Sequence, residues 1–197
     1  MQSSTSALYH AELQAFIQVH AELMRILHVL RDVEPQAFIA AGVIRNSIWA
    51  HLHGQAYLMH QTEIDVVYFD VQDDGTGEQK IREQLEARFP QMVWDVVNQA
   101  RVHHWYRLEH GGCIAPYCSL TEALAAWPET ATAVAVQLDA QGQCQIVAPF
   151  GLQDLFELNL RWNPAMVSYA VFQQRFESKA FLSTWPKLKM ISAEPGI

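Results

Sequence analysis

The sequence is poor in positive charge and in cysteine, and each shortage excludes a class of protein. Thirteen lysines and arginines stand against 21 aspartates and glutamates, which gives a formal net charge of −8. Nucleic-acid phosphates are bound by clustered Lys and Arg side chains, so we expect no broad nucleic-acid-binding surface. The three cysteines, Cys113, Cys118 and Cys144, are too few for a disulfide framework.

Long uncharged apolar runs are also missing. None approaches the roughly 18 residues of a membrane span, and the polar start from Met1 to Ser6 is not followed by the charged-then-apolar pattern of a signal peptide. We therefore expect a cytoplasmic protein with no membrane partner.

What the chain does have is enough apolar sequence for a core, since half of its 197 residues are hydrophobic. We predict a single domain over residues 1-197. Its expected parts are an N-terminal helix at 8-33, a core at 36-150 and C-terminal helices at 151-186.

The periodicity of apolar residues predicts alternating helices and strands. Apolar residues at helical spacing, or residues typical of helix caps, indicate helices. The predicted helices lie at residues 11–31, 43–53, 79–89, 120–126, 151–160 and 165–185. Short apolar or alternating runs indicate strands, and they lie at 37–41, 64–70, 93–98, 132–138 and 144–148. This order favours an α+β fold in which one mixed sheet is flanked by helices.

The segment from Phe38 to Asp70 carries the candidate site. A buried strand is expected to turn tightly at Gly42 into a helix, whose N-terminus can bind phosphate. Glu63 and Asp65 begin the next strand, and the side-chain period of two places both on one face. Two such carboxylates can hold a divalent cation. A solvated strand edge gives the same pattern, and that alternative stays open.

Two arginines are candidates for neutralising a triphosphate, because a guanidinium matches phosphate oxygens. Arg45 follows the glycine turn, and Arg101 lies in the polar segment that begins at Asn98. For Arg45 an internal salt bridge to a carboxylate is the rival interpretation. A zinc site is the weaker interpretation of His103, His104, Cys113 and Cys118, since their spacing is irregular.

Three short motifs resemble the head of the DNA polymerase beta-like nucleotidyltransferases. They are Ala41-Gly42-Val43-Ile44-Arg45-Asn46, Leu52-His53-Gly54 and Glu63-Ile64-Asp65. They are similar to the patterns G-G-x-V-R-D, L-x-G and D-I-D of CCA-adding enzymes and bacterial poly(A) polymerases. The chain departs from these patterns at Ala41, Asn46 and Glu63.

The chain also resembles a family of small bacterial nucleotidyltransferase-like proteins. The segments that carry this resemblance are Arg45-Asn46, Trp49, Asp65 to Asp70, Trp94 to Arg101 and Trp127 to Val134. The resemblance implies a polymerase-beta-like nucleotidyltransferase fold with a metal-nucleotide site, and it names no substrate.

From these residues and the resemblance we expect a magnesium-dependent (or manganese-dependent) nucleotidyltransferase that moves an NMP group from an NTP to an acceptor. The acceptor could be a small molecule, a protein or an RNA end. The expected catalytic and metal-binding residues are Glu63, Asp65 and Asp95, and the expected nucleotide-binding residues are Gly42, Arg45, Asn46, Asn98 and Arg101. Asp95 is the candidate third carboxylate, with an exposed strand aspartate as its rival interpretation. Two alternatives remain: a nucleotide-binding module of the same fold without catalysis, and an interaction protein.

Overall fold

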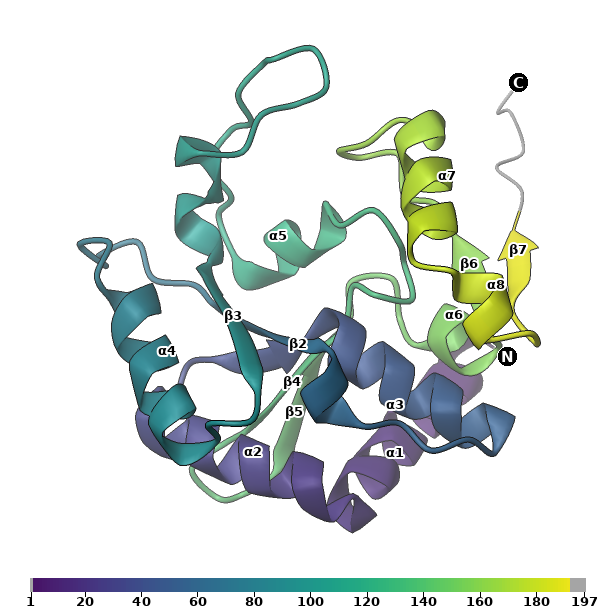
Figure 1. Cartoon of the computed structure of the whole chain (residues 1–197), viewed down its shortest axis with the longest axis horizontal. Helices are drawn as coiled ribbons and strands as arrows, with labels where there is room; N and C mark the ends of the chain where they lie inside the picture. Colours follow the sequence, from purple (N-terminus) through teal and green to yellow (C-terminus); the bar gives the residue numbers. More distant parts are fainter. Residues whose placement is uncertain (1, 192–197) are drawn as a thin grey trace.

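The computed structural model describes residues 2–191, and its centre is a five-stranded mixed sheet (Figure 1). The strands are β1 (Phe38–Ala40), β2 (Glu63–Tyr68), β3 (Val93–Asn98), β4 (Ala135–Leu138) and β5 (Cys144–Val147). Their order is β3-β2-β1-β4-β5, with β2 and β3 parallel and the other neighbours antiparallel. The predicted α+β class, with one mixed sheet flanked by helices, is confirmed.

The remaining elements surround this sheet. The helices are α1 (Gln2–Val19), α2 (Ala21–Val33), α3 (Ala41–His53), α4 (Gly77–Arg88), α5 (Leu120–Ala125), α6 (Gln153–Phe156), α7 (Tyr169–Ser178) and α8 (Phe181–Thr184), with 3-10 turns η1 (Met59–Gln61) and η2 (Gln99–His104). Two short parallel strands, β6 (Asn159–Arg161) and β7 (Lys189–Ile191), pair near the end of the chain. Within the described range, no helix combines the length and the apolar character needed to cross a membrane.

The two faces of the sheet have different partners. On one face, buried residues of the strands, such as Ile64, Val66 and Trp94, join the main core with α1, α2 and α4. On the other face, Phe38 and Val67 belong to a smaller cluster that α5 covers. Because side chains alternate along a strand, Asp65 of β2 and Asp95 of β3 lie on this second face.

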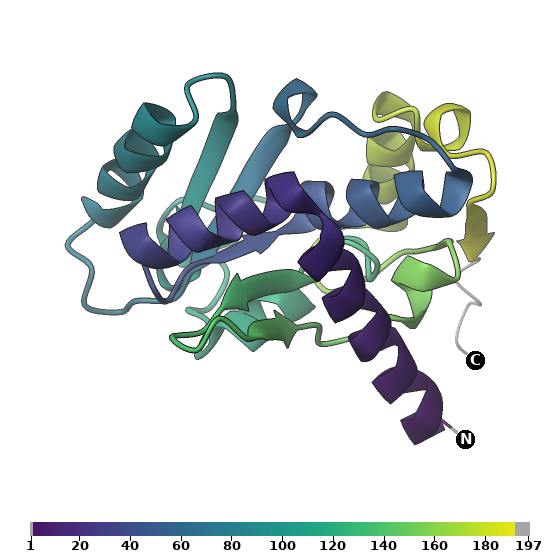
Figure 2. The same ribbon diagram turned by 90° about the horizontal axis from the view of Figure 1, so that it is seen from below.

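The predicted N-terminal helix at 8-33 is two helices with a bend between them, as Figure 2 shows. His20 causes the break: its backbone is extended, and its Nδ1 accepts a hydrogen bond from the Leu23 N–H at 3.3 Å. A side chain that satisfies an amide of the first turn is an N-cap, so His20 begins α2.

The C-terminal part also differs from its prediction. The helix expected over 151–160 is the single turn α6 followed by strand β6. The helix expected over 165–185 is divided into α7 and α8 by Ala180, whose φ of 50° is left-handed. An apolar helical pattern does not reveal such a residue, because alanine is otherwise the best helix former.

The turn before α3 is made by Ala41 rather than by Gly42. Ala41 has a φ of 53°, and it directly follows the last residue of β1. Gly42 lies inside the first turn of α3, where a side chain would be in ordinary contact, 3.7 Å from Asp65 Oδ2. The expectation that Gly42 permits the turn is therefore corrected.

Replacing Ala180 by glycine should stabilise the protein. A left-handed residue with a Cβ atom costs about 1–2 kcal/mol, and the extra entropy of glycine in the unfolded chain offsets about 0.4–1 kcal/mol of that. Ala180 is exposed, so no packing is lost. We expect Ala180→Gly to raise the melting temperature by about 1–4 °C in calorimetry.

The matched control is Ala140→Gly, at an exposed residue outside the left-handed region. It should lower the melting temperature slightly. Equal effects of the two substitutions would show that Ala180 is not strained.

Candidate active site

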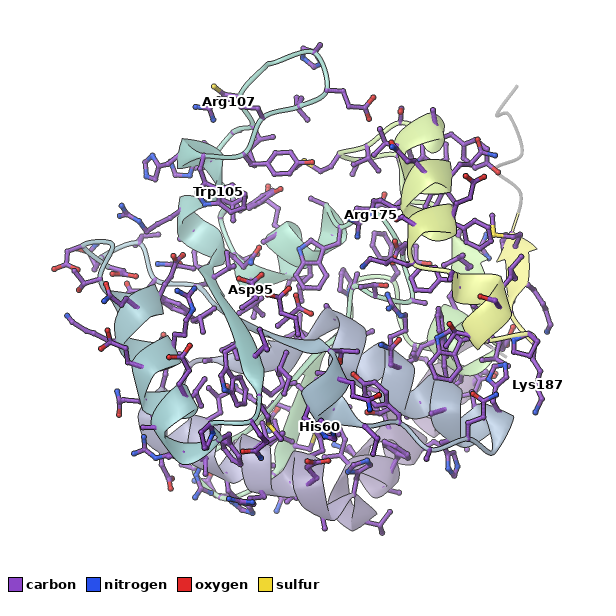
Figure 3. All side chains as sticks on the ribbon, viewed as in Figure 1. His60, Asp95, Trp105, Arg107, Arg175 and Lys187 are labelled. Carbon is purple, nitrogen blue, oxygen red and sulfur yellow. The ribbon has the colours of Figure 1, made fainter. Side chains whose placement is uncertain are left out.

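Two aspartates from adjacent strands line one cavity. Asp65 and Asp95 are register partners in the parallel pair β2–β3, and both contribute to the wall of a cavity of about 550 Å³. Figure 3 shows Asp95 near the opening that Trp105 and Arg175 flank from opposite sides. The structure thus brings Asp95 to the same cavity as Asp65, and its role as a third carboxylate of the site stays a prediction.

The Asp65 carboxyl is held in an unfavourable environment for a negative charge. Burial is the main cause that raises its pKa to about 6, and the carboxylates of Asp95 and Glu63 raise it further. The N–H of Gly42 opposes this by donating a hydrogen bond to Asp65 Oδ2 at 3.4 Å. A cation bound here would relieve the electrostatic cost.

Glu63 stands at the edge of this arrangement. It is exposed at the start of β2, and together with Asp65 it lines a second cavity of about 660 Å³. Among the residues that the structure describes, no three His, Cys, Asp or Glu side chains are grouped closely enough to hold a metal ion. The predicted convergence of three carboxylates is therefore not seen, and the pair Asp65–Asp95 is the part that fits a hard cation with oxygen ligands.

Arg45 is occupied by an internal partner. Only 3% of it is exposed, and its Nη1 donates to Glu129 Oε2 at 3.2 Å and to Thr132 Oγ1 at 2.7 Å. Its guanidinium also lies over the ring of Phe181, 4.5 Å from the centroid. The rival interpretation of Arg45 as one half of a buried salt bridge is confirmed, although its side chain still reaches the walls of both cavities.

Of the other expected nucleotide-binding residues, Gly42 and Asn46 lie at the site. Gly42 lines both cavities and Asn46 lines the second. Asn46 Oδ1 accepts hydrogen bonds from Arg45 Nε and Nη2 at 3.3 and 3.1 Å. It therefore orients the guanidinium from the side opposite Glu129.

Asn98 and Arg101 lie outside both cavities. The fully buried Asn98 donates from Nδ2 to the carbonyl of Asp70 at 2.7 Å and accepts from the Asp70 N–H at 3.1 Å. Arg101 Nη1 donates to the carbonyl of Asp73 at 2.8 Å. Both side chains support the loop between β2 and α4, and the structure does not bring them to the aspartates.

The site contains residues that the motifs did not identify. Lys179 lines both cavities, and Arg175, one helical turn earlier, lines the first. Their spacing of four residues in a predicted helix was the available signal, since such residues share a face. The first cavity also has an aromatic wall of Trp105, Tyr106, Tyr117 and Trp127, for which the sequence offered no pattern.

The raised pKa of Asp65 predicts a pH-dependent effect of Asp65→Asn on stability. Below the ordinary value of 3.8 the carboxyl is neutral in both the folded and the unfolded chain, so it costs nothing. As pH rises from 3.8 to about 6 the unfolded chain ionises first, and wild-type stability falls. Asp65→Asn avoids this loss, so without metal its advantage should grow from near zero at pH 4 to at most about 3 kcal/mol at pH 7. Urea denaturation at pH 4 and at pH 7 measures the difference in unfolding free energy between Asp65→Asn and wild type. Glu86→Gln, at an exposed residue, is the control. An advantage that does not change with pH would contradict the assignment.

Arg45→Met should destabilise the fold strongly, because it leaves Glu129 buried without its close partner. Breaking a buried ion pair from one side costs about 3–5 kcal/mol. Arg161→Met, which breaks the more exposed ion pair with Asp154, should cost less than about 1 kcal/mol. Denaturant titration compares the two variants, and similar losses would show that the Arg45–Glu129 pair is not an important contact.

Comparison with known proteins shows which proteins this chain is similar to. A protein-family model described as Nucleotidyltransferase matches residues 31–190. Among solved structures, the chain is similar to a protein whose NMR structure reveals a CCA-adding enzyme head domain, with 26% identity and a TM-score of 0.77; the match covers 93% of this chain and 96% of that one.

Longer proteins share the fold alone. A CCA-adding enzyme in apo form II is 14% identical with a TM-score of 0.56, covering 92% of this chain and 44% of that one. The Thermotoga maritima CCA-adding enzyme complexed with tRNA is 14% identical with a TM-score of 0.55, covering 87% and 39%. This chain thus spans less than half of their length. No curated protein matches it. The match to the family model extends over most of the sequence and includes both aspartates, and the chain therefore belongs to the nucleotidyltransferase family.

Proposed function

We propose that this protein transfers a nucleotidyl group from a nucleoside triphosphate to an acceptor, with magnesium or manganese held by Asp65 and Asp95. One observation carries the proposal: two aspartates that are register partners on parallel strands line the same cavity in a chain of this family. Glu63 adds negative charge on the same face of β2.

The residues present fit a divalent cation. Asp65 and Asp95 supply the oxygen ligands that magnesium prefers, and the raised pKa of Asp65 shows that the Gly42 N–H and the charge of Lys179 do not offset its burial and the neighbouring carboxylates. When bound, such an ion favours ionisation of an acceptor hydroxyl and neutralises phosphate charge.

The chain's own groups then position the reactants. Gly42 holds Asp65 by its N–H, and the N-terminus of α3, at the boundary of both cavities, offers further backbone N–H groups to a phosphate. The acceptor oxygen attacks the α-phosphorus and a new P–O bond forms. The bond to pyrophosphate breaks, and the acceptor proton passes to water.

The two cavities give separate room for nucleotide and acceptor. They meet at Gly42, Arg45, Asp65 and Lys179, which line both. The aromatic wall of the first cavity suits stacking of a planar ring such as a nucleobase. A CCA-adding enzyme of this fold was solved in complex with CTP, which supports a nucleoside triphosphate as one substrate. The acidic net charge makes a small molecule or a protein a better acceptor than a long RNA.

The test is to incubate the protein with each labelled nucleoside triphosphate, magnesium or manganese, and whole-cell lysate, and then to search for labelled products. We expect labelled product from wild type and from the control Glu86→Gln. Asp65→Asn and Asp95→Asn should each reduce labelling at least ~100-fold, since each removes a charge that acts on the transferred phosphate. Chelation of the metal should have the same effect.

The outcomes separate the functional classes. Nucleotide binding in calorimetry without transfer to any acceptor would favour the non-catalytic nucleotide-binding module. No binding of any nucleotide by a folded protein would contradict both readings and leave an interaction protein.

A further inference from the structure

Near the two aspartates, three cationic side chains gather around one buried carboxylate. Glu129, of which 1% is exposed, lies 3.2 Å from Arg45 Nη1 and 3.6 Å from Arg175 Nε. Lys179 also lines both cavities next to this group. In the part of the chain that the structure describes, no carboxylate lies within ion-pair distance of the Lys179 ammonium.

The carboxylates whose negative charge favours Arg45 and Lys179 are Glu129 and, to a smaller extent, Asp65, and neither lies within ion-pair distance of Lys179. Arg175 Nε is buried and has no hydrogen-bond partner among the described residues, and neither has Glu129 Oε1, the oxygen it faces. Although Lys179 is exposed as a residue, burial around its ammonium lowers the pKa of that group, and Arg45 and Arg175 lower it further, while Glu129 and Asp65 oppose this effect only in part. Lys179 is therefore a cation on the cavity wall that has no ion-pair partner among the described residues.

The backbone places these cations across the cavity from the aspartates. Lys179 is the C-cap of α7, where a helix end favours positive charge. Figure 1 shows α7 and β3 well apart in the molecule, and residues of both line the first cavity. Left-handed Ala180 then turns the chain into α8. Lys179 thus lies near the two aspartates without forming an ion pair with either of them.

We propose that Lys179, assisted by Arg175, binds the polyphosphate of the nucleotide. The polyphosphate lies at the shared boundary of the two cavities, between the cations of α7 and the aspartates. This is the role that the sequence motifs suggested for Arg45 and Arg101, which Glu129 and the Asp73 carbonyl occupy instead. The inference rests on the proposed function, because it names the group that recognises its substrate.

The alternative is a purely structural role. The Lys179 ammonium lies 6.0 Å from the centroid of the Phe181 ring, a distant cation–π contact. If that contact were its purpose, loss of the charge would affect stability and leave anion binding unchanged.

The experiment compares Lys179→Met, which keeps an apolar stem, with Lys179→Arg, which keeps the charge. Lys80→Met is the matched control, since Lys80 is exposed on α4 and lines neither cavity. Calorimetry measures the binding of inorganic tripolyphosphate and of a non-hydrolysable nucleoside triphosphate with magnesium. We expect Lys179→Met to raise the dissociation constants of tripolyphosphate and of the nucleotide at least tenfold. The dissociation constants of Lys179→Arg and Lys80→Met should stay within about threefold of those of wild type.

A second measurement does not require a variant to fold. Because the pKa of its ammonium is lowered, Lys179 has a larger uncharged, nucleophilic fraction at a given pH than an ordinary exposed lysine, so mass spectrometry of wild type treated with an acylating reagent should show Lys179 labelled earlier than Lys80. Tripolyphosphate should protect Lys179 and leave Lys80 labelled. If a saturating concentration of tripolyphosphate does not slow the acylation of Lys179, the proposal is overturned.

The outcomes distinguish this inference from the proposed function. If wild type and Lys179→Met bind the nucleotide equally, the role of Lys179 is refuted and nucleotidyl transfer stands. If tripolyphosphate binds in a Lys179-dependent way and no nucleotide binds, the anion site stands and the proposed function falls. If wild type binds neither tripolyphosphate nor nucleotide, both the role of Lys179 and the proposed nucleotidyl transfer are refuted.

Discussion

The buried ion pair between Arg45 and Glu129 is the contact on which the arrangement of the site depends. It joins α3 to the segment before β4, 84 residues away, and Arg175 of α7 approaches the same carboxylate. Taking these charges out of water is costly, so the geometry must hold both of them well. Thr132 contributes by hydrogen bonds to both members at 2.7 and 2.6 Å. Three segments distant in sequence are thereby fixed around one point beneath the cavities.

A second constraint links the turn at Ala41 to the carboxylate it faces. Ala40 of β1 is the register partner of Asp65 on β2, so the chain leaves the sheet beside that aspartate. Because no residue separates β1 from α3, the first turn of the helix begins at the site. This close approach requires the strained left-handed φ of Ala41. It also brings the Gly42 N–H within hydrogen-bond distance of the Asp65 carboxylate.

Sequence reasoning succeeded where the signal was local and periodic. Alternation of apolar residues placed five strands in the order of the chain, and the period of two put Glu63 and Asp65 on one face. It failed where the deciding contact was distant or specific. Nothing near Arg45 reveals Glu129 as its partner, and the motif position of Arg101 does not show that a loop carbonyl holds it. Nor does an apolar helical pattern reveal that Ala180 adopts a left-handed conformation.

The site contains one carboxyl and one ammonium group whose charged forms are both disfavoured in the folded protein. Burial and neighbouring carboxylates raise the pKa of Asp65, while burial and neighbouring guanidiniums lower the pKa of Lys179. Each shift means that the charged form is disfavoured in the folded protein, so the charges of Asp65 and Lys179 do not stabilise the free protein. A ligand that brings a divalent cation to the aspartates and phosphate oxygens to the lysine would relieve both costs in one binding event. A metal-bound polyphosphate is such a ligand, and the free energy released on relief of both costs would add to its affinity. The positions of Asp65 and Lys179 on the cavity walls are therefore consistent with the proposed binding of a metal–polyphosphate ligand.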